Sequence, residues 1–328
     1  MSETHVLVLD DDPPPRLDRL AGRATVSHCD AKSLAARLPE ADVLLVWDFT
    51  SDAVRDAWPE PGPGVRHPAW VHTASAGVDR LLFPALTASE AVVTNARGVF
   101  DRPIAEYVAG LVLAMAKDFP RTWELQRRRR WEHRDAQKVS GSLAVVVGSG
   151  PIGRRIGVTL RALGVETELV GRRARDGDPD FGRVHAVDEM ERLLPDADWV
   201  VCAAPLTAET TGMFDAAAFS LMKPTARFIN VGRGQHVVES DLAEALRSGR
   251  LAGAALDVFA SEPLPGDSAL WELPGLIVSP HMSGDTAGWR DDLSEQFCDN
   301  FDRWVAGRPM INVVDKRLGY VPTGQADA

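Results

Sequence analysis

Short apolar runs alternate with amphipathic segments along the whole chain, a pattern typical of strands that alternate with helices. In the clearest unit, residues 144–173, an apolar run, a glycine turn, an amphipathic segment and a second apolar run follow one another. Within and after this unit, strands are predicted at 144–147, 166–170, 199–203, 228–231, 254–258 and 276–279, with a helix at 239–248. The alternation predicts a parallel, doubly wound sheet whose ligands bind beyond the carboxyl ends of the strands.

The first hundred residues predict a smaller open α/β domain, with strands at 5–9, 43–46, 70–73 and 91–94 and helices at 31–38 and 51–57. A helix that starts at Pro103, with Asp101 as its expected cap, leads out of this domain. A last amphipathic helix at 288–307 carries a stripe of core residues, Leu293, Phe297, Phe301 and Trp304. The final segment, TGQADA, is expected to be disordered.

Three glycines follow the strand at 144–147. Gly148, Gly150 and Gly153 have the GxGxxG spacing: the first permits a tight turn, the second lets the backbone approach a pyrophosphate, and the third allows close contact of helix and strand. The free N–H groups and the dipole of the helix that begins here attract phosphates. These features indicate a dinucleotide-binding unit.

The end of the second strand indicates which dinucleotide is bound. Enzymes that use NAD usually carry an acidic residue about 20 residues past the glycines, whereas this chain has Gly171, Arg172 and Arg173. A carboxylate there would bind the ribose 2′-hydroxyl and repel a 2′-phosphate, but two guanidiniums offer forked donors to a phosphate. The sequence therefore predicts that NADP(H) is preferred and NAD(H) is possible. The alternative is a pair of solvated surface arginines.

Length and composition, with 328 residues of which 45% are hydrophobic and 25% charged, predict a globular chain with two cores. The N-terminus predicts neither a signal peptide nor a membrane span, so a cytoplasmic location is expected. Cys29, Cys202 and Cys298 are scattered, which argues against a disulfide framework or a metal site. A net charge of −11 argues against nucleic-acid binding, and the basic run at 127–130 is interpreted as a solvated helix end or a subunit contact.

Three candidate catalytic residues stand just after consecutive predicted strands: Arg233, Glu262 and His281. An arginine can pair with a carboxylate and polarise a neighbouring carbonyl. A histidine can pass a proton when hydride is added to that carbonyl, and a carboxylate beside the imidazole favours its charged form and fixes its orientation. Together they predict a carbonyl reductase site. Taken singly, each has a structural alternative: a salt-bridged arginine, a turn glutamate and a loop histidine.

The order of the motifs GSGPIG, APLTAETTGMF, MKPTARFINVGRG, LDVFASEP and SPHMSG resembles the D-isomer-specific 2-hydroxyacid dehydrogenase family, in its glyoxylate/hydroxypyruvate reductase branch. This resemblance covers nearly the whole chain. It implies two Rossmann-like doubly wound domains, a dinucleotide-binding domain at 102–286 inserted in a discontinuous, flavodoxin-like substrate domain at 1–101 and 287–328. The implied activity is reduction of a small 2-oxo acid to the D-2-hydroxy acid, in a homodimer whose contact includes residues 121–131.

The resemblance also assigns site residues. It gives the catalytic roles to Arg233, Glu262 and His281, with Arg233 and His281 also binding substrate. The backbone of Ala76, Gly77 and Val78 would bind the substrate carboxylate, and Asp257 would anchor the nicotinamide carboxamide. The implied cofactor-binding residues are Gly148, Gly150, Pro151, Ile152, Gly153, Arg172, Arg173, Pro205, Thr207, Val231, Asp257 and Gly284.

The chain departs from the family pattern at two places. The acidic residue that would bind the ribose 2′-hydroxyl is missing, as in family members that use NADPH, and Pro151 stands where many relatives carry a polar residue. Two other functions remain open. A phosphoglycerate dehydrogenase is disfavoured by the arginine pair and by the lack of a regulatory domain after residue 328. A nucleotide-sensing corepressor uses the same fold to bind partner proteins.

Overall fold

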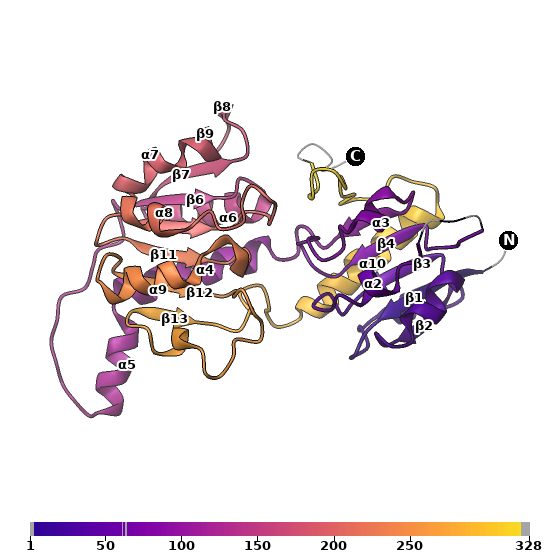
Figure 1. Ribbon diagram of the computed structural model, residues 1–328, viewed down its shortest axis with the longest axis horizontal. Helices are drawn as coiled ribbons and strands as arrows, with labels where there is room; N and C mark the ends of the chain where they lie inside the picture. The colour runs from indigo at the N-terminus through magenta and orange to yellow at the C-terminus, as the bar shows by residue number, and fades with distance from the viewer. Residues whose placement is uncertain (1–2, 61, 63, 323–328) are drawn as a thin grey trace. The chain divides into compact units, whose positions relative to one another are not determined.

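The computed structural model describes residues 3–60, 62 and 64–322, and the contacts among them form two compact units (Figure 1). The first unit, here called unit 1, is made by residues 1–100 and 286–328, and unit 2 by residues 101–285. The segment TGQADA lies outside the described residues.

Unit 1 contains a five-stranded parallel sheet in the order β2-β1-β3-β4-β5. Its strands are β1 (Thr4–Leu9), β2 (Ala24–Cys29), β3 (Val43–Val46), β4 (Trp70–Thr73) and β5 (Val92–Asn95). This is the flavodoxin-like strand order, so the predicted fold class is confirmed for this unit. Strand β2 was not predicted, because it lies at the sheet edge and only two of its six residues are buried.

Helices cover both faces of this sheet. The short helices α1 (Leu34–Arg37), α2 (Ala53–Ala57) and α3 (Pro84–Ala88) share one apolar cluster with the strands. The long helix α10 (Trp289–Val305) packs on the sheet through stacked rings, with the centroids of Phe297 and Trp70 5.2 Å apart. The helix predicted at 31–38 is wrong at its start. Asp30 Oδ1 accepts a hydrogen bond from Ser33 N over 2.9 Å, so a turn precedes α1.

A row of ion pairs joins the segment at residues 16–23 to α10. Arg16 pairs with Asp291 and Glu295, and Arg19 Nη2 lies 3.0 Å from Asp299 Oδ1. Arg23 continues the row to Asp302. The segment includes the 3-10 helix η1 (Leu17–Leu20). Because these side chains are largely exposed, the row fixes the position of the segment more than it stabilises the unit.

Unit 2 contains an eight-stranded sheet in the order β13-β12-β11-β10-β6-β7-β9-β8. Its strands are β6 (Leu143–Val147), β7 (Glu166–Gly171), β8 (Arg175–Asp178), β9 (Gly182–Ala186), β10 (Trp199–Cys202), β11 (Arg227–Asn230), β12 (Gly253–Leu256) and β13 (Leu276–Val278). Seven strands are parallel, and the strand order reverses between β6 and β10, as in a Rossmann fold. The prediction of a wholly parallel sheet needs one correction, since β8 pairs antiparallel with β9.

Helices again lie on both faces. The helices α4 (Asp101–Ala116) and α6 (Pro151–Ala162) pack against each other, and α7 (Met190–Leu193), α8 (Ala216–Leu221) and α9 (Glu239–Arg247) share the other apolar cluster (Figure 1). Helix α4 begins at Asp101, so this residue lies in the first turn of the helix, and the prediction that it is the cap is wrong. Helix α5 (Phe119–Arg127) extends away from the sheet (Figure 1). The other 3-10 helices are η2 (Leu38–Glu40), η3 (Val187–Glu189), η4 (Leu194–Asp196), η5 (Gly234–His236) and η6 (Ala269–Glu272).

The β8–β9 hairpin is fastened to α6 by a buried carboxylate. Asp178 accepts two hydrogen bonds from the Arg154 guanidinium, at 2.6 and 3.0 Å, and two more from the backbone N–H groups of Asp180 and Phe181. The Arg154 hydrogen bond above all, with the backbone donors, holds the pKa of Asp178 far below its usual range, although burial opposes this. The Arg161 guanidinium lies over the ring of Phe181, with Arg161 Cζ 4.4 Å from the ring centroid.

No described helix combines the length and apolar character needed to cross a membrane.

Candidate active site

The three glycines in the turn after β6 have two different steric roles. Gly148 has a φ of +123°, and a Cβ on it would lie 2.4 Å from the carbonyl oxygen of Ala203 at the end of β10. A Cβ on Gly153 would lie 1.7 Å from the Gly148 oxygen, whereas one on Gly150 would meet no atom within 4 Å. The first and third glycines are therefore required by packing. The second opens onto free space at the N-terminus of α6, which fits a pyrophosphate cradle.

Strand β7 ends at Gly171, next to the residues that the sequence predicts to bind the ribose. A Cβ on Gly171 would lie 2.4 Å from Ser149 Oγ, so Arg172 is the first residue there with room for a side chain. Arg172 and Arg173 are both exposed. The pKa of Glu209 lies below its usual value, mainly because Thr207 donates a hydrogen bond to it, and the charge of Arg172 adds to this. Arg172 thus lies near the loop that carries Thr207.

The loop after β10 carries Pro205 and Thr207, which the sequence assigned to the cofactor. Thr210 braces this loop: its Oγ1 donates to the Pro205 oxygen and accepts from Thr207 N, each over 2.8 Å. The loop therefore has a fixed shape before any ligand binds.

Arg233 lies in a tight turn after β11, two residues past the buried Val231. The buried Asn230 side chain donates to the Arg233 oxygen over 2.9 Å and accepts from Gly232 N over 3.0 Å. A Cβ on Gly234 would lie 1.8 Å from the Phe259 carbonyl carbon, so the turn is pressed against the loop after β12. The turn positions the Arg233 backbone rigidly.

His236 is a residue of this site that the sequence did not single out. Its ring is fully buried, and Nδ1 lies 3.0 Å from Arg233 N while Nε2 lies 3.3 Å from the Pro205 oxygen. The signal available was a histidine three residues after the arginine in GRGQH. That spacing does not show that the ring reaches a loop 31 residues away in sequence.

Glu262 and His281 form a direct pair. Glu262 Oε2 lies 2.8 Å from His281 Nδ1, and Oε1 accepts a hydrogen bond from Phe259 N over 2.8 Å. Burial alone would raise the pKa of Glu262, but the hydrogen bonds from His281 and Phe259 and the charges of His281 and Arg233 outweigh it, so this pKa lies below its usual value. The carboxylate stays ionised at neutral pH and orients the imidazole. Nε2, on the far side of the ring, is then the nitrogen suited to proton transfer.

The backbone at His281 is held in an uncommon conformation by Asp257. The φ of His281 is +52°, a left-handed value that costs energy for a residue with a Cβ. The buried Asp257 carboxylate accepts from Ser279 Oγ at 2.6 Å, Met282 N at 3.0 Å and Ser283 N at 2.9 Å. The donors of these hydrogen bonds lie before and after His281 in the sequence, and the buried Gly284 follows them. Asp257 therefore fixes the turn that presents the imidazole.

The three candidate catalytic residues thus follow three neighbouring strands of unit 2, β11, β12 and β13, at the carboxyl edge of the sheet. Ala76, Gly77 and Val78 belong to unit 1, after β4. Side chains brace this loop as well: Asn95 Nδ2 donates to the Ala76 oxygen and Ser75 Oγ to the Gly77 oxygen, each over 2.6 Å.

The chain is similar to several known proteins. Residues 109–283 match the family described as D-isomer specific 2-hydroxyacid dehydrogenase, NAD binding domain. The crystal structure of a D-isomer specific 2-hydroxyacid dehydrogenase family protein from Aeromonas salmonicida is similar with a TM-score of 0.82 and 32% identity, covering 96% of this chain and 100% of that one. An NADPH-dependent glyoxylate/hydroxypyruvate reductase from Sinorhizobium meliloti, solved with NADP and sulfate, gives a TM-score of 0.81 and 26% identity, covering 97% and 100%.

A curated relative with a different activity also aligns along the chain. The D-3-phosphoglycerate dehydrogenase of Mycobacterium tuberculosis is 29% identical over 332 residues, which cover 98% of this chain and 60% of that protein. The family description covers more than half of the chain, and the solved structures cover nearly all of it. The chain therefore belongs to the D-isomer specific 2-hydroxyacid dehydrogenase family and is an NAD(P)-dependent oxidoreductase.

Proposed function

We propose that this enzyme reduces a small 2-oxo acid, such as glyoxylate, hydroxypyruvate or a bulkier pyruvate, to the D-2-hydroxy acid and prefers NADPH. The observation that carries the proposal is the pairing of His281 with Glu262 over 2.8 Å, with the charge of Arg233 acting on the same carboxylate. An acid group, its orienting carboxylate and a guanidinium are the groups that reduction of a carbonyl beside a carboxylate needs.

Each residue has a role in this reaction. Arg233 binds the substrate carboxylate and polarises the oxo group, which stabilises the charge that develops on oxygen. His281 donates its Nε2 proton to that oxygen, and Glu262 keeps the imidazole oriented. NADPH, when bound, supplies the hydride. The backbone of Ala76, Gly77 and Val78 is proposed to hold the substrate carboxylate.

The cofactor assignment rests on the edge of unit 2 that holds the glycine turn. Gly148, Gly150, Pro151, Ile152 and Gly153 form the cradle for the pyrophosphate. Arg172 and Arg173 are proposed to bind the 2′-phosphate, since they are exposed at the ribose end of β7. The remaining proposed contacts are Pro205, Thr207, Val231, Asp257 and Gly284, with Asp257 on the carboxamide.

Initial rates decide between the candidate functions. NADPH and NADH are compared side by side against glyoxylate, hydroxypyruvate, pyruvate, phenylpyruvate and 2-oxoisovalerate, with 3-phosphoglycerate tested in the oxidative direction. We expect turnover of a 2-oxo acid with NADPH well above that with NADH. Turnover of 3-phosphoglycerate alone would replace the proposal by a phosphoglycerate dehydrogenase. Tight NADPH binding without any turnover would favour a nucleotide-sensing protein.

Matched variants test the arginine pair. Replacing Arg172 and Arg173 together by alanine should raise the KM for NADPH about 10- to 100-fold, because each loses charge-assisted hydrogen bonds to a phosphate. The KM for NADH should change less than about twofold, which also serves as the folding control. Equal losses for both cofactors would contradict the assignment.

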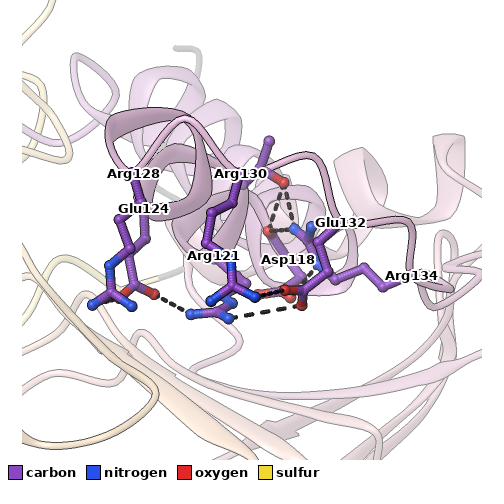
Figure 2. Close-up of polar contacts among 8 residues, drawn as sticks. Asp118, Arg121, Glu124, Arg128, Arg130, Glu132 and Arg134 are labelled. Atoms are coloured by element: carbon purple, nitrogen blue, oxygen red, sulfur yellow. Dashed lines mark hydrogen bonds and ion pairs between the residues drawn. The ribbon is translucent and has the colours of Figure 1, made fainter.

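We also propose that the enzyme is a homodimer that associates through the α5 arm, residues 119–134. Figure 2 shows how ion pairs stiffen this arm: Glu124 lies between Arg121 and Arg128, at 2.7 and 2.5 Å, and Arg134 Nε reaches Asp118 over 2.9 Å. The arm nevertheless exposes three aromatic side chains, Phe119, Trp123 and Trp131. Stiff, exposed aromatic surface is typical of a protein interface.

Light scattering after size exclusion tests the dimer. The wild type should have twice the chain mass, and replacing Trp123 and Trp131 by serine should yield monomers with an unchanged Tm for unit 2. A wild type that is monomeric at about 50 µM, a concentration far above the Kd of a stable dimer, would contradict the proposal.

A further inference from the structure

We propose that His236 is a positioning residue that couples the Arg233 turn to the Pro205–Thr207 loop through its two ring nitrogens. The inference rests on the proposed function, in which Arg233 binds the oxo acid and the loop binds the cofactor. One neutral imidazole would then set the geometry of both binding steps.

The hydrogen-bond partners fix the state of the ring. Nδ1 lies 3.0 Å from both the nitrogen and the oxygen of Arg233. That oxygen already accepts from Asn230 Nδ2 over 2.9 Å and from His236 N over 3.2 Å, so its lone pairs are engaged. Nδ1 therefore accepts from the Arg233 N–H. The ring proton is then on Nε2, where it points to the Pro205 oxygen 3.3 Å away.

The surroundings leave the ring one position. His236 is completely buried, and a Cβ on Gly232 would lie 3.0 Å from its Nδ1 and Cε1, so glycine at 232 makes room for the imidazole. On the other side, the Pro205 oxygen also accepts from Thr210 Oγ1, which holds the loop from outside. Displacing the ring would loosen the arginine turn and the loop together.

The two contacts can be removed one at a time. An asparagine amide occupies approximately the place of Nδ1 and a glutamine amide that of Nε2. His236→Asn keeps the acceptor for Arg233 N and loses the donor to Pro205, whereas His236→Gln keeps the donor and loses the acceptor. The two variants are thus matched in chemistry and differ in which loop they release.

The test measures NADPH binding by fluorescence titration and the KM for glyoxylate, or for the best acid of the panel, in both variants. We expect His236→Asn to weaken NADPH binding about tenfold with the KM for the acid nearly unchanged, because the Pro205 carbonyl of the cofactor loop loses one of its two hydrogen-bond donors and keeps only Thr210 Oγ1. His236→Gln should raise the KM for the acid about tenfold and leave the NADPH Kd nearly unchanged. A general loss of stability would not weaken one constant in one variant and the other constant in the other variant.

His72→Asn in unit 1 is the control, because His72 is also fully buried and its Nδ1 lies 2.8 Å from Thr94 Oγ1. This variant should lower Tm without changing the NADPH Kd and the KM for the acid independently of each other. Parallel losses of both constants in His236→Asn and His236→Gln, or no change in either, would overturn the coupling. The NADPH titration needs no turnover. If the wild type reduced no 2-oxo acid, the proposed function would fail, yet equal NADPH Kd values for the two variants would still overturn this inference and a difference between them would support it.

Discussion

Asp178→Asn tests whether the buried carboxylate holds the β8–β9 hairpin onto α6. The substitution keeps the shape of the side chain and removes its charge, so an amide N–H group faces the Arg154 guanidinium. In the wild type the carboxylate is only 3% exposed and accepts two guanidinium and two backbone hydrogen bonds. The side chain is thus the centre of the contact and not one of several equivalent ion pairs.

The expected loss follows from burial and from what Arg154 keeps. Removing one partner of a buried ion pair costs about 3–5 kcal/mol. The Arg154 side chain is 23% exposed, however, and still reaches Asp180 over 2.5 Å, so water and this second carboxylate recover part of the loss. We expect the free energy of unfolding of unit 2 to fall by about 2–3 kcal/mol. Asp180→Asn, at a half-exposed position, should cost about 0.5 kcal/mol and is the matched control.

Urea unfolding between pH 3 and 8 is the assay. Because the folded pKa of Asp178 lies below the unfolded value, its stabilisation is complete above the unfolded pKa and is lost as the pH falls toward the folded one. The difference between wild type and Asp178→Asn should be constant from about pH 5 to 8 and shrink below about pH 4. A difference under about 0.5 kcal/mol at pH 7, or one that grows on acidification, would refute this reasoning.

Three further predictions concern other parts of the chain. Gly234→Ala should destabilise unit 2 by at least about 3 kcal/mol, because its Cβ would lie 1.8 Å from a backbone carbon. Gly110→Ala, at an exposed position of α4 with open space around it, should instead stabilise the unit by up to about 1 kcal/mol, and thermal unfolding compares the two. Glu262→Gln should lower kcat/KM about 10- to 100-fold with an unchanged NADPH Kd, because the carboxylate that orients His281 is lost. Stopped-flow rates that match the wild type would exclude this role. Arg19→Ala should cost less than about 1 kcal/mol in dilute buffer and nothing measurable in 1 M salt, and a larger, salt-independent loss in chemical denaturation would show that this ion pair is not merely superficial.

The strands could be predicted from the sequence where their apolar side chains face a core on both sides of the sheet. β3 and β4 are wholly buried and agree with the predicted ranges. β3 is an apolar run of four residues, and β4 begins with the apolar pair Trp70 and Val71, and such runs have few stable environments other than a buried strand. Strands β8 and β9 have no such pattern. The sequence RDGD of β8 is polar, and the hairpin depends on Arg154 and Phe181, which meet only after α6 has packed on the sheet.

The candidate site divides in the same way. The position of Arg233, Glu262 and His281 after successive strands could be predicted, because parallel strands bring their carboxyl ends to one edge. The connection made by His236 could not, since it depends on a ring orientation set by Gly232 and on a loop that is distant in sequence. Hydrophobic patterning reports which side chains are buried but not which polar atoms they meet.

The short, charged strand β8 has a consequence for the resistance of the protein to aggregation at high concentration. An outer strand with free backbone groups is a template on which another chain can add a strand. In unit 2 the edges are β8, which carries an arginine and two aspartates in four residues, and β13, which has three residues. In unit 1 the free side of β5 is partly covered by the chain at 312–314, through the antiparallel bridge between Thr94 and Val313. Loss of the hairpin would uncover β7, a longer and more apolar strand, so weakening the Arg154–Asp178 contact should promote fibrous aggregation as well as unfolding.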